Sequence, residues 1–422
     1  KKCKIEKAMK SPEVYLIFVL FLCIIILSPA AAWSQLTLGQ YEDEAPVRTW
    51  NLALTTSAQS LSMGGTQFAF SQDCSCALTN PALLDRLPRI SFALSLSTTR
   101  ASLSKYSIIN TGVISTEGNS TLGLYAADFA GVSLRLRGWT FAFSTALIEN
   151  YDRPHVKLEY TYFGSPYESI DFNQGGELKN INISASHKIF RKVSLGIGVN
   201  FISGFFEKNI EEKWTQSNIT ITDSISHDFS GFYLNGGLVV DVSDSLTAAA
   251  VFRSPYSKKA DSQSLLEYNA PQGDTDIKIE ASSKCSFRQP LMVGVGINYK
   301  PSESVRIASD CAFFNWSEYK VNYFEEDLKR DFKNILKIGA GIEYITYQRF
   351  FNRNIEVPFR IGAVYDPQPM KNPDSQYFYF TFGMGAKYGK FFLDAAGMVG
   401  KEKGSGDNLL GQKFSITLGL YL

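Results

Sequence analysis

The sequence predicts an all-β fold: a transmembrane, up-and-down, antiparallel β-barrel of about 14 strands with an N-terminal hatch, or plug. Three observations lead to this prediction. Segments of about ten residues alternate between large apolar residues and small or polar ones, as in strands with one face toward an apolar medium. The connections between segments are alternately short and long. Aromatic residues reach 14% of the chain beside 32 glycines, which favours strands over helices.

The charge balance excludes one class of partner. The 422 residues carry 42 Lys and Arg against 41 Asp and Glu, a formal net charge of +1. A chain that binds nucleic acid through its backbone phosphates needs a basic surplus. We therefore expect no nucleic-acid partner.

Residues 1–34 have the pattern of a secretory signal peptide. The apolar run 14–27 is too short for a spanning helix, which needs about 20 residues. Lysines precede the run, and the small residues Ser28-Pro29-Ala30-Ala31-Ala32 follow it. The alternative is an N-terminal membrane anchor. A signal peptide predicts export, and with a barrel it predicts the bacterial outer membrane.

Residues 35–88 are expected to form the hatch. The segment mixes Gly64-Gly65 with prolines at 46, 81 and 88 and has no sustained hydrophobic period, so it does not form regular strands. It can hang in the periplasm or fold back into the barrel lumen. Its apolar content favours burial in the lumen, and hence a plug.

Residues 89–422 are expected to form the barrel. In the first segment Ile90, Phe92, Leu94 and Leu96 alternate with small residues, and the last segment, 414–422, alternates in the same way. Between them the clearest strands are expected near 128–137, 139–149, 181–190, 193–206, 229–241, 245–254, 289–300, 304–315, 334–346, 356–366, 377–388 and 390–400.

The predicted connections follow an outer-membrane rhythm. Short turns are expected at 137–138, 190–192, 243–244, 301–303 and 388–390. Long polar loops are expected at 150–180, 207–228, 255–288, 316–333 and 367–376. Outer-membrane barrels have short periplasmic turns and long extracellular loops, with aromatic girdles at both interfaces. A soluble β-sandwich or propeller pair would explain the alternation but not this rhythm.

The chain offers little catalytic chemistry. His155 and His227 fall in expected loops and His187 falls near a strand end, none of them in a setting that resembles a catalytic triad. Neither a P-loop nor a dinucleotide fingerprint is present in the sequence. We therefore expect no enzyme and no cofactor.

Four cysteines remain after the signal peptide, at 74, 76, 285 and 311. Four in a chain of this length do not make a disulfide scaffold, so we interpret them as small packing residues. A Cys285–Cys311 bridge is the alternative, because an exported protein meets oxidising conditions.

Three stretches resemble the FadL-type outer-membrane transporters of hydrophobic compounds. Residues 57–94 resemble the family's N-terminal hatch, which has a Gly-rich turn, an acidic residue and an Asn-Pro-Ala motif before the first barrel strand. Further along, residues 314–319 (FNWSEY) and 357–366 (VPFRIGAVYD) resemble later strands of the family, in the same order. The hatch residues that match are Met63, Gly64, Gly65, Asp73, Asn80, Pro81 and Ala82.

The resemblance implies a passive transporter. A fatty acid-like or other hydrophobic ligand would bind among the extracellular loops and move to an internal pocket. Rearrangement of the hatch would then open a lateral exit to the outer-membrane lipids. The Met-Gly-Gly form of the hatch is also similar to PorV-like barrels, which implies an alternative role as a partner or anchor in type IX protein secretion.

A few residues are candidates for gating and binding. Gly64 and Gly65 can adopt backbone angles forbidden to other residues and are candidate hinges, or they are simple turns. Asn80 can bond its own backbone and fix a turn at Asn80-Pro81.

Three further residues are candidates for contact with the ligand. One ring of Phe205-Phe206 is expected to point inward, with a bulge there to aim it at a lumenal ligand, or else to be an ordinary interface aromatic. Arg360 is opposite in phase to its apolar neighbours and is expected to face the lumen, where it binds a ligand carboxylate or pairs with lumenal acids such as Glu356.

Overall fold

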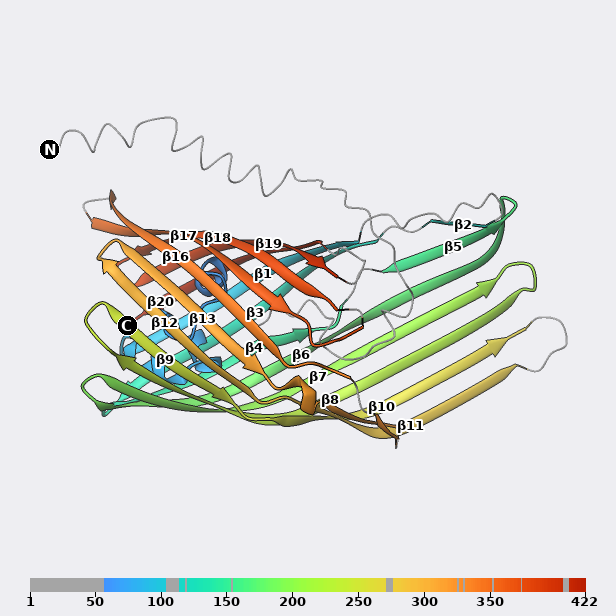
Figure 1. Cartoon of the computed structure of the whole chain (residues 1–422), viewed down its shortest axis with the longest axis horizontal. Helices are drawn as coiled ribbons and strands as arrows, with labels where there is room; N and C mark the ends of the chain where they lie inside the picture. Colours follow the sequence, from blue (N-terminus) through green and yellow to red (C-terminus); the bar gives the residue numbers. More distant parts are fainter. Residues whose placement is uncertain are drawn as a thin grey trace, which may run out of the picture. The chain divides into compact units, whose positions relative to one another are not determined.

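The first and last strands of the chain pair with each other and close the sheet into a barrel (Figure 1). β1 (Ile90–Leu103) pairs antiparallel with β20 (Leu410–Tyr421) on one side and with β3 (Ser120–Leu136) on the other. All neighbouring pairs are antiparallel, and the closed sheet has 14 strand positions around the barrel. We call each position a stave; it holds one long strand or two collinear ones. The predicted fold class, a closed 14-strand antiparallel barrel, is therefore confirmed.

The computed structural model describes residues 57–103, 114–117, 120–152, 155–270, 276–324, 326–328, 331–350, 353–372, 374–404 and 410–422. All of them belong to one unit, Trp33–Leu422. The predicted signal peptide and the first part of the predicted hatch, residues 35–56, lie outside the described residues. No helix among the described residues is long and apolar enough to cross a membrane.

Some staves consist of two collinear strands. β9 and β10 form one stave interrupted at Pro255, and β12 and β11 form the next, interrupted at Pro290. Proline has no N–H to donate to a ladder, so a strand breaks where it occurs. The remaining strands are β2 (Ile114–Glu117), β4 (Trp139–Asn150), β5 (Val156–Tyr162), β6 (Ser165–Phe190), β7 (Val193–Trp214), β8 (Ile219–Asp241), β9 (Leu246–Arg253), β10 (Tyr256–Asn269), β11 (Ile277–Gln289), β12 (Met292–Ser302), β13 (Val305–Phe314), β14 (Lys320–Tyr323), β15 (Glu326–Leu328), β16 (Ile335–Phe350), β17 (Arg353–Pro367), β18 (Gln376–Tyr388) and β19 (Phe391–Lys403).

The outer face of the barrel is apolar and the inner face is small or polar. On β1, Phe92 and Leu94 are 42% and 40% exposed, whereas Ser91 and Ser95 are fully buried toward the lumen. Most of the exposed large hydrophobic side chains lie on barrel strands, as expected for a surface in contact with lipid. The alternation of apolar and small or polar residues in the sequence therefore corresponds to the outer and inner faces of the barrel wall.

Several predicted long loops are wrong, because the strands continue through them. β7 and β8 pair without interruption from Val193 and Val240 to Trp214 and Ile219. Most of the predicted loop 207–228 is therefore strand. β10 and β11 likewise pair up to Tyr268 and Ile277. These extensions carry polar residues on both faces, so the apolar alternation stops there although the backbone ladder does not. In Figure 1 the hairpins of β6 to β8, β10 and β11 project beyond the ends of β17 to β19.

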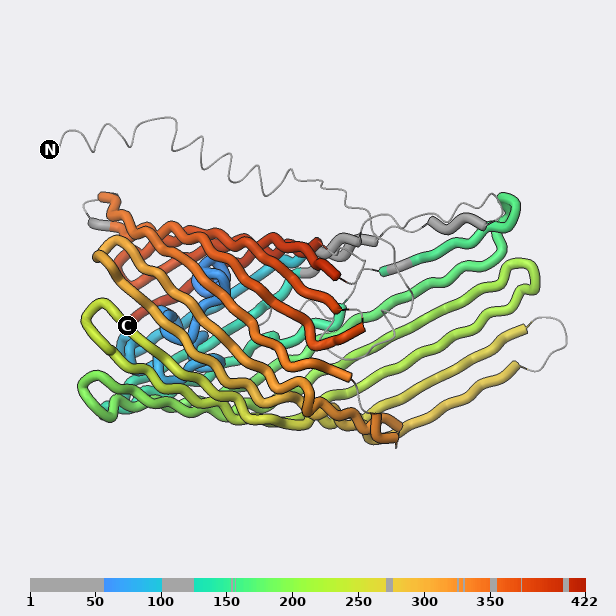
Figure 2. Tube along the Cα trace, viewed as in Figure 1, coloured from blue at the N-terminus to red at the C-terminus, as the bar shows by residue number. Residues whose placement is uncertain are grey.

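The hatch residues that the structure describes lie inside the barrel, in the half nearer the short turns (Figures 1 and 2). They form α3 (Ala58–Ser62) and two 3₁₀ helices, η3 (Cys74–Leu78) and η4 (Pro81–Arg86). Each helix starts at a polar cap: the side chains of Ser57, Asp73 and Asn80 accept hydrogen bonds from the first-turn N–H groups. Another short 3₁₀ helix, η5 (Trp316–Glu318), follows β13.

The cysteines of the barrel and hatch are free. Cys74, Cys76 and Cys285 are buried and Cys311 is partly buried, each as a thiol. The alternative of a Cys285–Cys311 bridge is therefore wrong. Cys285 packs among apolar side chains of the inner wall, and Cys311 lies on a different stave.

Candidate ligand cavity and hatch

The hatch backbone lies directly on glycines of the barrel wall. A side chain at Gly341 of β16 would place its Cβ 2.5 Å from the carbonyl oxygen of Met63, too close for real atoms. A Cβ at Gly339 or Gly362 would collide with the backbone of Gly64 in the same way. On the other side of the lumen, a Cβ at Gly196 of β7 would meet the backbone of Pro81, its oxygen at 2.7 Å. We call these four residues, Gly196, Gly339, Gly341 and Gly362, the glycine pad. They allow backbone to pack on backbone.

Polar side chains of the wall hold the hatch backbone above this pad. Asp310 of β13 accepts hydrogen bonds through Oδ2 from the N–H groups of Gln67 (2.6 Å) and Phe68 (2.8 Å). Asn235 of β8 donates to the carbonyl of Ala77 (2.9 Å), and the N–H of Gly64 donates to the hydroxyl of Thr381 (3.0 Å). Because these groups are buried, each bond satisfies a donor or acceptor that would otherwise be stranded in the lumen.

The hatch residues that the sequence singled out occupy defined places. Gly64 and Gly65 have φ angles of +69° and +73°, in the left-handed region that glycine adopts without strain. Met63 is fully buried against Phe70 and Ala308, and the Asp73 carboxylate caps η3 through the N–H of Ser75 at 2.8 Å.

The Asn-Pro-Ala motif forms the start of η4. The Asn80 side chain accepts a hydrogen bond from the N–H of Ala82 (3.1 Å) and donates to the carbonyl of Phe68 (2.6 Å). Pro81 occupies the first turn, where a missing N–H costs nothing. The motif therefore ties two parts of the hatch together.

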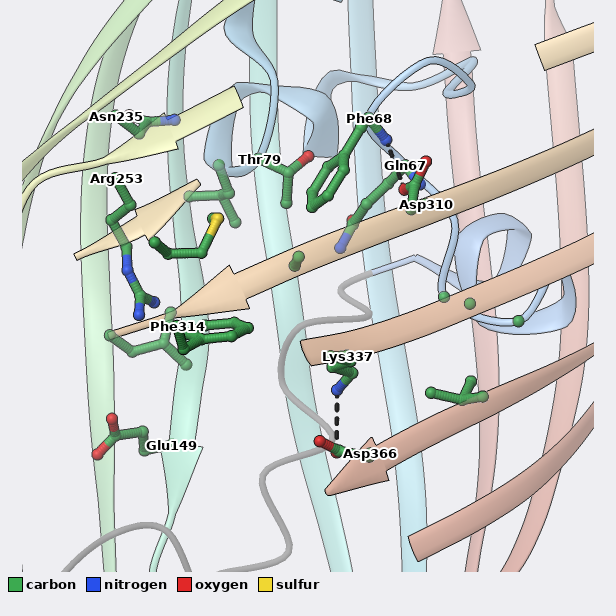
Figure 3. A pocket seen from close by; sticks show the side chains of 18 of the residues that line it. Gln67, Phe68, Thr79, Glu149, Asn235, Arg253, Asp310, Phe314, Lys337 and Asp366 are labelled. Carbon is green, nitrogen blue, oxygen red and sulfur yellow. Dashed lines mark hydrogen bonds and ion pairs between the residues drawn. The ribbon is translucent and has the colours of Figure 1, made fainter. Parts of the chain in front are cut away.

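A partly enclosed cavity of about 120 Å³ lies between the hatch and the wall. Phe68 and Leu78 contribute apolar surface from the hatch, and Met292, Phe314 and Met398 contribute it from the barrel (Figure 3). Phe314 ends β13 toward the long hairpins, so the cavity lies on the hairpin side of the hatch. The sequence placed no ligand pocket at these residues.

Most of the charged groups that line the cavity have partners. Lys337 pairs with Asp366 at 3.0 Å (Figure 3). Glu149 accepts from the buried Lys258 at 2.8 Å and also from the hydroxyl of Tyr151. The cavity is therefore an apolar space with a few fixed polar groups, the usual composition of a small-molecule site.

Phe206 points inward and Phe205 points outward, but not for the expected reason. Phe205 is 42% exposed, whereas Phe206 is buried. β7 pairs with β6 and β8 in unbroken register through both residues, so the expected bulge is wrong and ordinary alternation turns one ring inward. Phe206 does not line the cavity; it packs edge-on against Tyr151 and stacks on His227.

Arg360 faces the lumen as its phase predicts and pairs with lumenal acids, although Glu356, the example expected, is not one of them. It pairs with Glu343 through Nε (2.7 Å) and with Asp394 through Nη1, not with Glu356. Register explains the difference, because Glu343 lies opposite Arg360 on the neighbouring strand, whereas Glu356 pairs with Tyr347. Arg360 does not line the cavity beside the hatch, so it is a wall residue rather than a residue of that site.

The histidines lie in or between strands. His227 belongs to β8 rather than to a loop, and its Nδ1 lies 2.7 Å from the hydroxyl of Ser262. Both are buried, and neither lines the cavity, so this pair has no access to a substrate there. His187 lies on β6 near the short turns, and His155 lies between β4 and β5. Within the described ranges, no group of three His, Cys, Asp or Glu side chains could hold a metal ion.

A second and larger space opens among the projecting hairpins. It has a volume of about 1,120 Å³, and most of its lining residues, which come mainly from β6, β7, β8, β10 and β11, are polar, including Gln174 and Lys208. It is more open to solvent than the cavity above the hatch. We call this larger space the vestibule.

Solved structures with the same fold include two toluene transporters. A FadL homologue from Pseudomonas aeruginosa superposes with a TM-score of 0.63 at 15% identity, over 88% of this chain and 98% of that one. The toluene transporter TodX of Pseudomonas putida gives 0.61 at 14% identity, over 87% and 98%. The toluene transporter TbuX of Ralstonia pickettii gives 0.57 at 14% identity, over 86% and 97%. The barrel therefore has the FadL-type fold, as the hatch motifs indicated.

Sequence comparison identifies the family. A search of curated proteins finds no match. The family model described as BamG matches residues 50–422. The match includes every described residue of the hatch and residues 89–422, which form the barrel. The chain belongs to the BamG family.

Proposed function

We propose that the protein is a passive outer-membrane channel for compact hydrophobic compounds. The observation that carries the proposal is the mainly apolar, partly enclosed cavity of about 120 Å³ on the hairpin side of the hatch. A compound would enter through the polar vestibule, bind in the cavity, and leave after the hatch changes its position. The names of two structural relatives, both toluene transporters, point to the same class of compound.

The size of the cavity favours a small ring over a long acyl chain. A cavity of about 150 Å³ lined by apolar side chains holds benzene, and this one is close to that volume. A long-chain fatty acid has several times as many atoms and would fit only if the hatch moved first. We therefore rank compact compounds above the fatty acids that the FadL resemblance implies.

Binding in the cavity is favourable, and release needs a change in the hatch. A ring the size of a Phe side chain buries roughly 150–250 Å² of apolar surface, which contributes roughly 4–6 kcal/mol. A rigid plug would keep such a ligand trapped. Gly64 and Gly65 join α3 to the irregular segment that carries Phe68, so rotation there would shift one wall of the cavity.

A lateral exit is proposed between β1 and β3. The ladder between these strands shifts register between Ser95 and Leu96, at the level of Asp128. The Nζ atom of Lys413 on β20 lies 2.7 Å from the Oδ2 atom of Asp128. Both side chains are buried, but the geometry of the pair is not that of a hydrogen bond. A bulge weakens the ladder locally, so the wall would part there more readily than elsewhere along β1. No observation favours the secretion role implied by the PorV resemblance, and we do not propose it.

Filling the cavity tests the proposal. Ala312 of β13 is buried and lines the cavity, so Ala312→Trp should occupy the space that a ligand needs. We expect cells carrying this variant to take up radiolabelled toluene at about a tenth of the wild-type rate or less, because overlap with a bulky ring costs at least 1–3 kcal/mol. The rate is measured at equal amounts of folded barrel in the outer membrane.

The matched control places the same residue on the lipid face. Val295 is 60% exposed on the outside of the barrel, so Val295→Trp should leave uptake unchanged. Palmitate is measured in parallel to rank the two substrate classes. Wild-type toluene uptake in the Ala312→Trp variant would refute the cavity as the transport site.

A further inference from the structure

The cavity is lined by a partly buried cation, Arg253, whose Nε atom has no hydrogen-bond partner. The guanidinium of Arg253, at the end of β9, lies among the rings of Tyr233 (5.9 Å), Tyr256 (6.0 Å) and Phe314 (5.6 Å) and lines the cavity. Its buried Nε has no hydrogen-bond partner, and among the described residues the side chain forms no ion pair. Aromatic faces attract a cation, but they do not replace the hydrogen bonds that it loses on leaving water.

The carboxylates around the cavity are already engaged by other groups. Glu149 is held by Lys258 and Tyr151, and Asp366 is held by Lys337. Asp310 accepts two hatch N–H groups through Oδ2. Glu149 and Asp366 therefore have cations of their own, and Asp310 lies on the other side of the cavity, so none of these three carboxylates pairs with Arg253.

The positions of these groups give the cavity two ends. Arg253 and Asp310 lie on opposite sides of the space in Figure 3, with Phe68 between them. Arg253 carries a positive charge, whereas Asp310 at the other end is an acid whose Oδ1 atom has no hydrogen-bond partner. A ligand anion is therefore favoured at the Arg253 end, and the apolar surfaces of Phe68 and Met292 remain for the rest of the molecule.

We propose that the cavity selects compact aromatic carboxylates, with the carboxylate on the Arg253 guanidinium and the ring against Phe68 and Met292. Such a ligand supplies the hydrogen-bond acceptors that Arg253 lacks, in the planar geometry that a guanidinium matches with two parallel bonds. The volume of about 120 Å³ limits the ring to about the size of benzene. The inference rests on the proposed function, because it specifies which compounds the channel binds.

The test compares benzoate with benzamide, a neutral molecule of the same size and shape. Binding of each to the purified full chain in mild detergent is measured by isothermal titration calorimetry. Because hydrogen bonds between charged groups are the strong ones, we expect benzoate to bind about 10- to 100-fold more tightly than benzamide. In Arg253→Met, which keeps the apolar bulk, the two affinities should become equal, while toluene should bind as in the wild type.

Controls separate the inference from the function on which it rests. Arg288 is exposed on β11, so Arg288→Met should keep the full preference for benzoate. Toluene binding without a preference for benzoate, or a preference that survives Arg253→Met, would overturn the inference and leave the hydrophobic channel intact. Failure of the wild type to bind toluene, benzamide and benzoate alike would overturn both.

Discussion

Replacing two glycines of the pad, Gly196→Ala together with Gly341→Ala, is expected to drive the hatch out of the barrel and open a pore. Each new methyl group would collide with hatch backbone, at Pro81 and at Met63, where no side-chain rotation can relieve the contact. Overpacking of this kind costs roughly 1–3 kcal/mol a site. The two sites lie on different staves and touch different parts of the hatch, so their costs should add to roughly 2–6 kcal/mol.

Single-channel conductance in planar bilayers measures the result. The wild type should show rare, small openings, and the double variant should show a persistent, ohmic conductance. Its hatch should also become sensitive to added protease. Gly236→Ala is the matched control, because its Cβ would meet only the oxygen of Gly196 at an ordinary 3.7 Å. A closed, protease-resistant double variant would show that the hatch is not held by close contact with the pad.

Arg360→Met should lower the free energy of unfolding of the barrel by about 3 kcal/mol, the lower end of the range for breaking a buried ion pair. The change leaves the buried Asp394 carboxylate without its cation. The cost stays at the lower end because Glu343 keeps a second partner, Arg306, at 2.7 Å. Urea unfolding in lipid vesicles, followed by tryptophan fluorescence, measures the change.

Two further variants test whether the buried Asp394 carboxylate, left without its cation, causes the loss of stability. Adding Asp394→Asn to Arg360→Met removes the stranded charge and should recover part of the loss. Lys371→Met breaks a pair with Asp331 in which both side chains are exposed, 48% and 81%, and should change the stability by only about 0–1 kcal/mol. An Arg360→Met barrel as stable as the Lys371→Met barrel would show that the network around Arg360 contributes little.

Alternation in the sequence predicts the part of each strand that faces lipid, and little beyond it. Phe92 and Leu94 stand out because their neighbours are small and face the lumen. In the hairpin extensions both faces of a strand carry polar residues, such as Glu207 and Lys208 of β7, so they give no apolar period. The 14 staves could therefore be predicted, whereas the length of the hairpins could not.

The candidate site was harder to predict than the barrel. The inward phase of Arg360 was correct, but register between strands, which one sequence does not reveal, decides that its partners are Glu343 and Asp394. The glycine pad was missed because Gly341 and Gly362 look like ordinary small lumenal residues until the hatch is placed on them. Arg253 has the same inward phase as Ala249 and Val251, a signal that could have marked it as lumenal.

Direct observation of a ligand in the cavity tests the central claim of this account. Crystals of the full chain soaked in 4-bromotoluene would show the bromine by its anomalous scattering. The account predicts a peak in the wild-type cavity, bordered by Phe68, Met292 and Phe314, and no such peak in Ala312→Trp. A bromine bound only on the lipid-facing surface, or equally in both proteins, would contradict it.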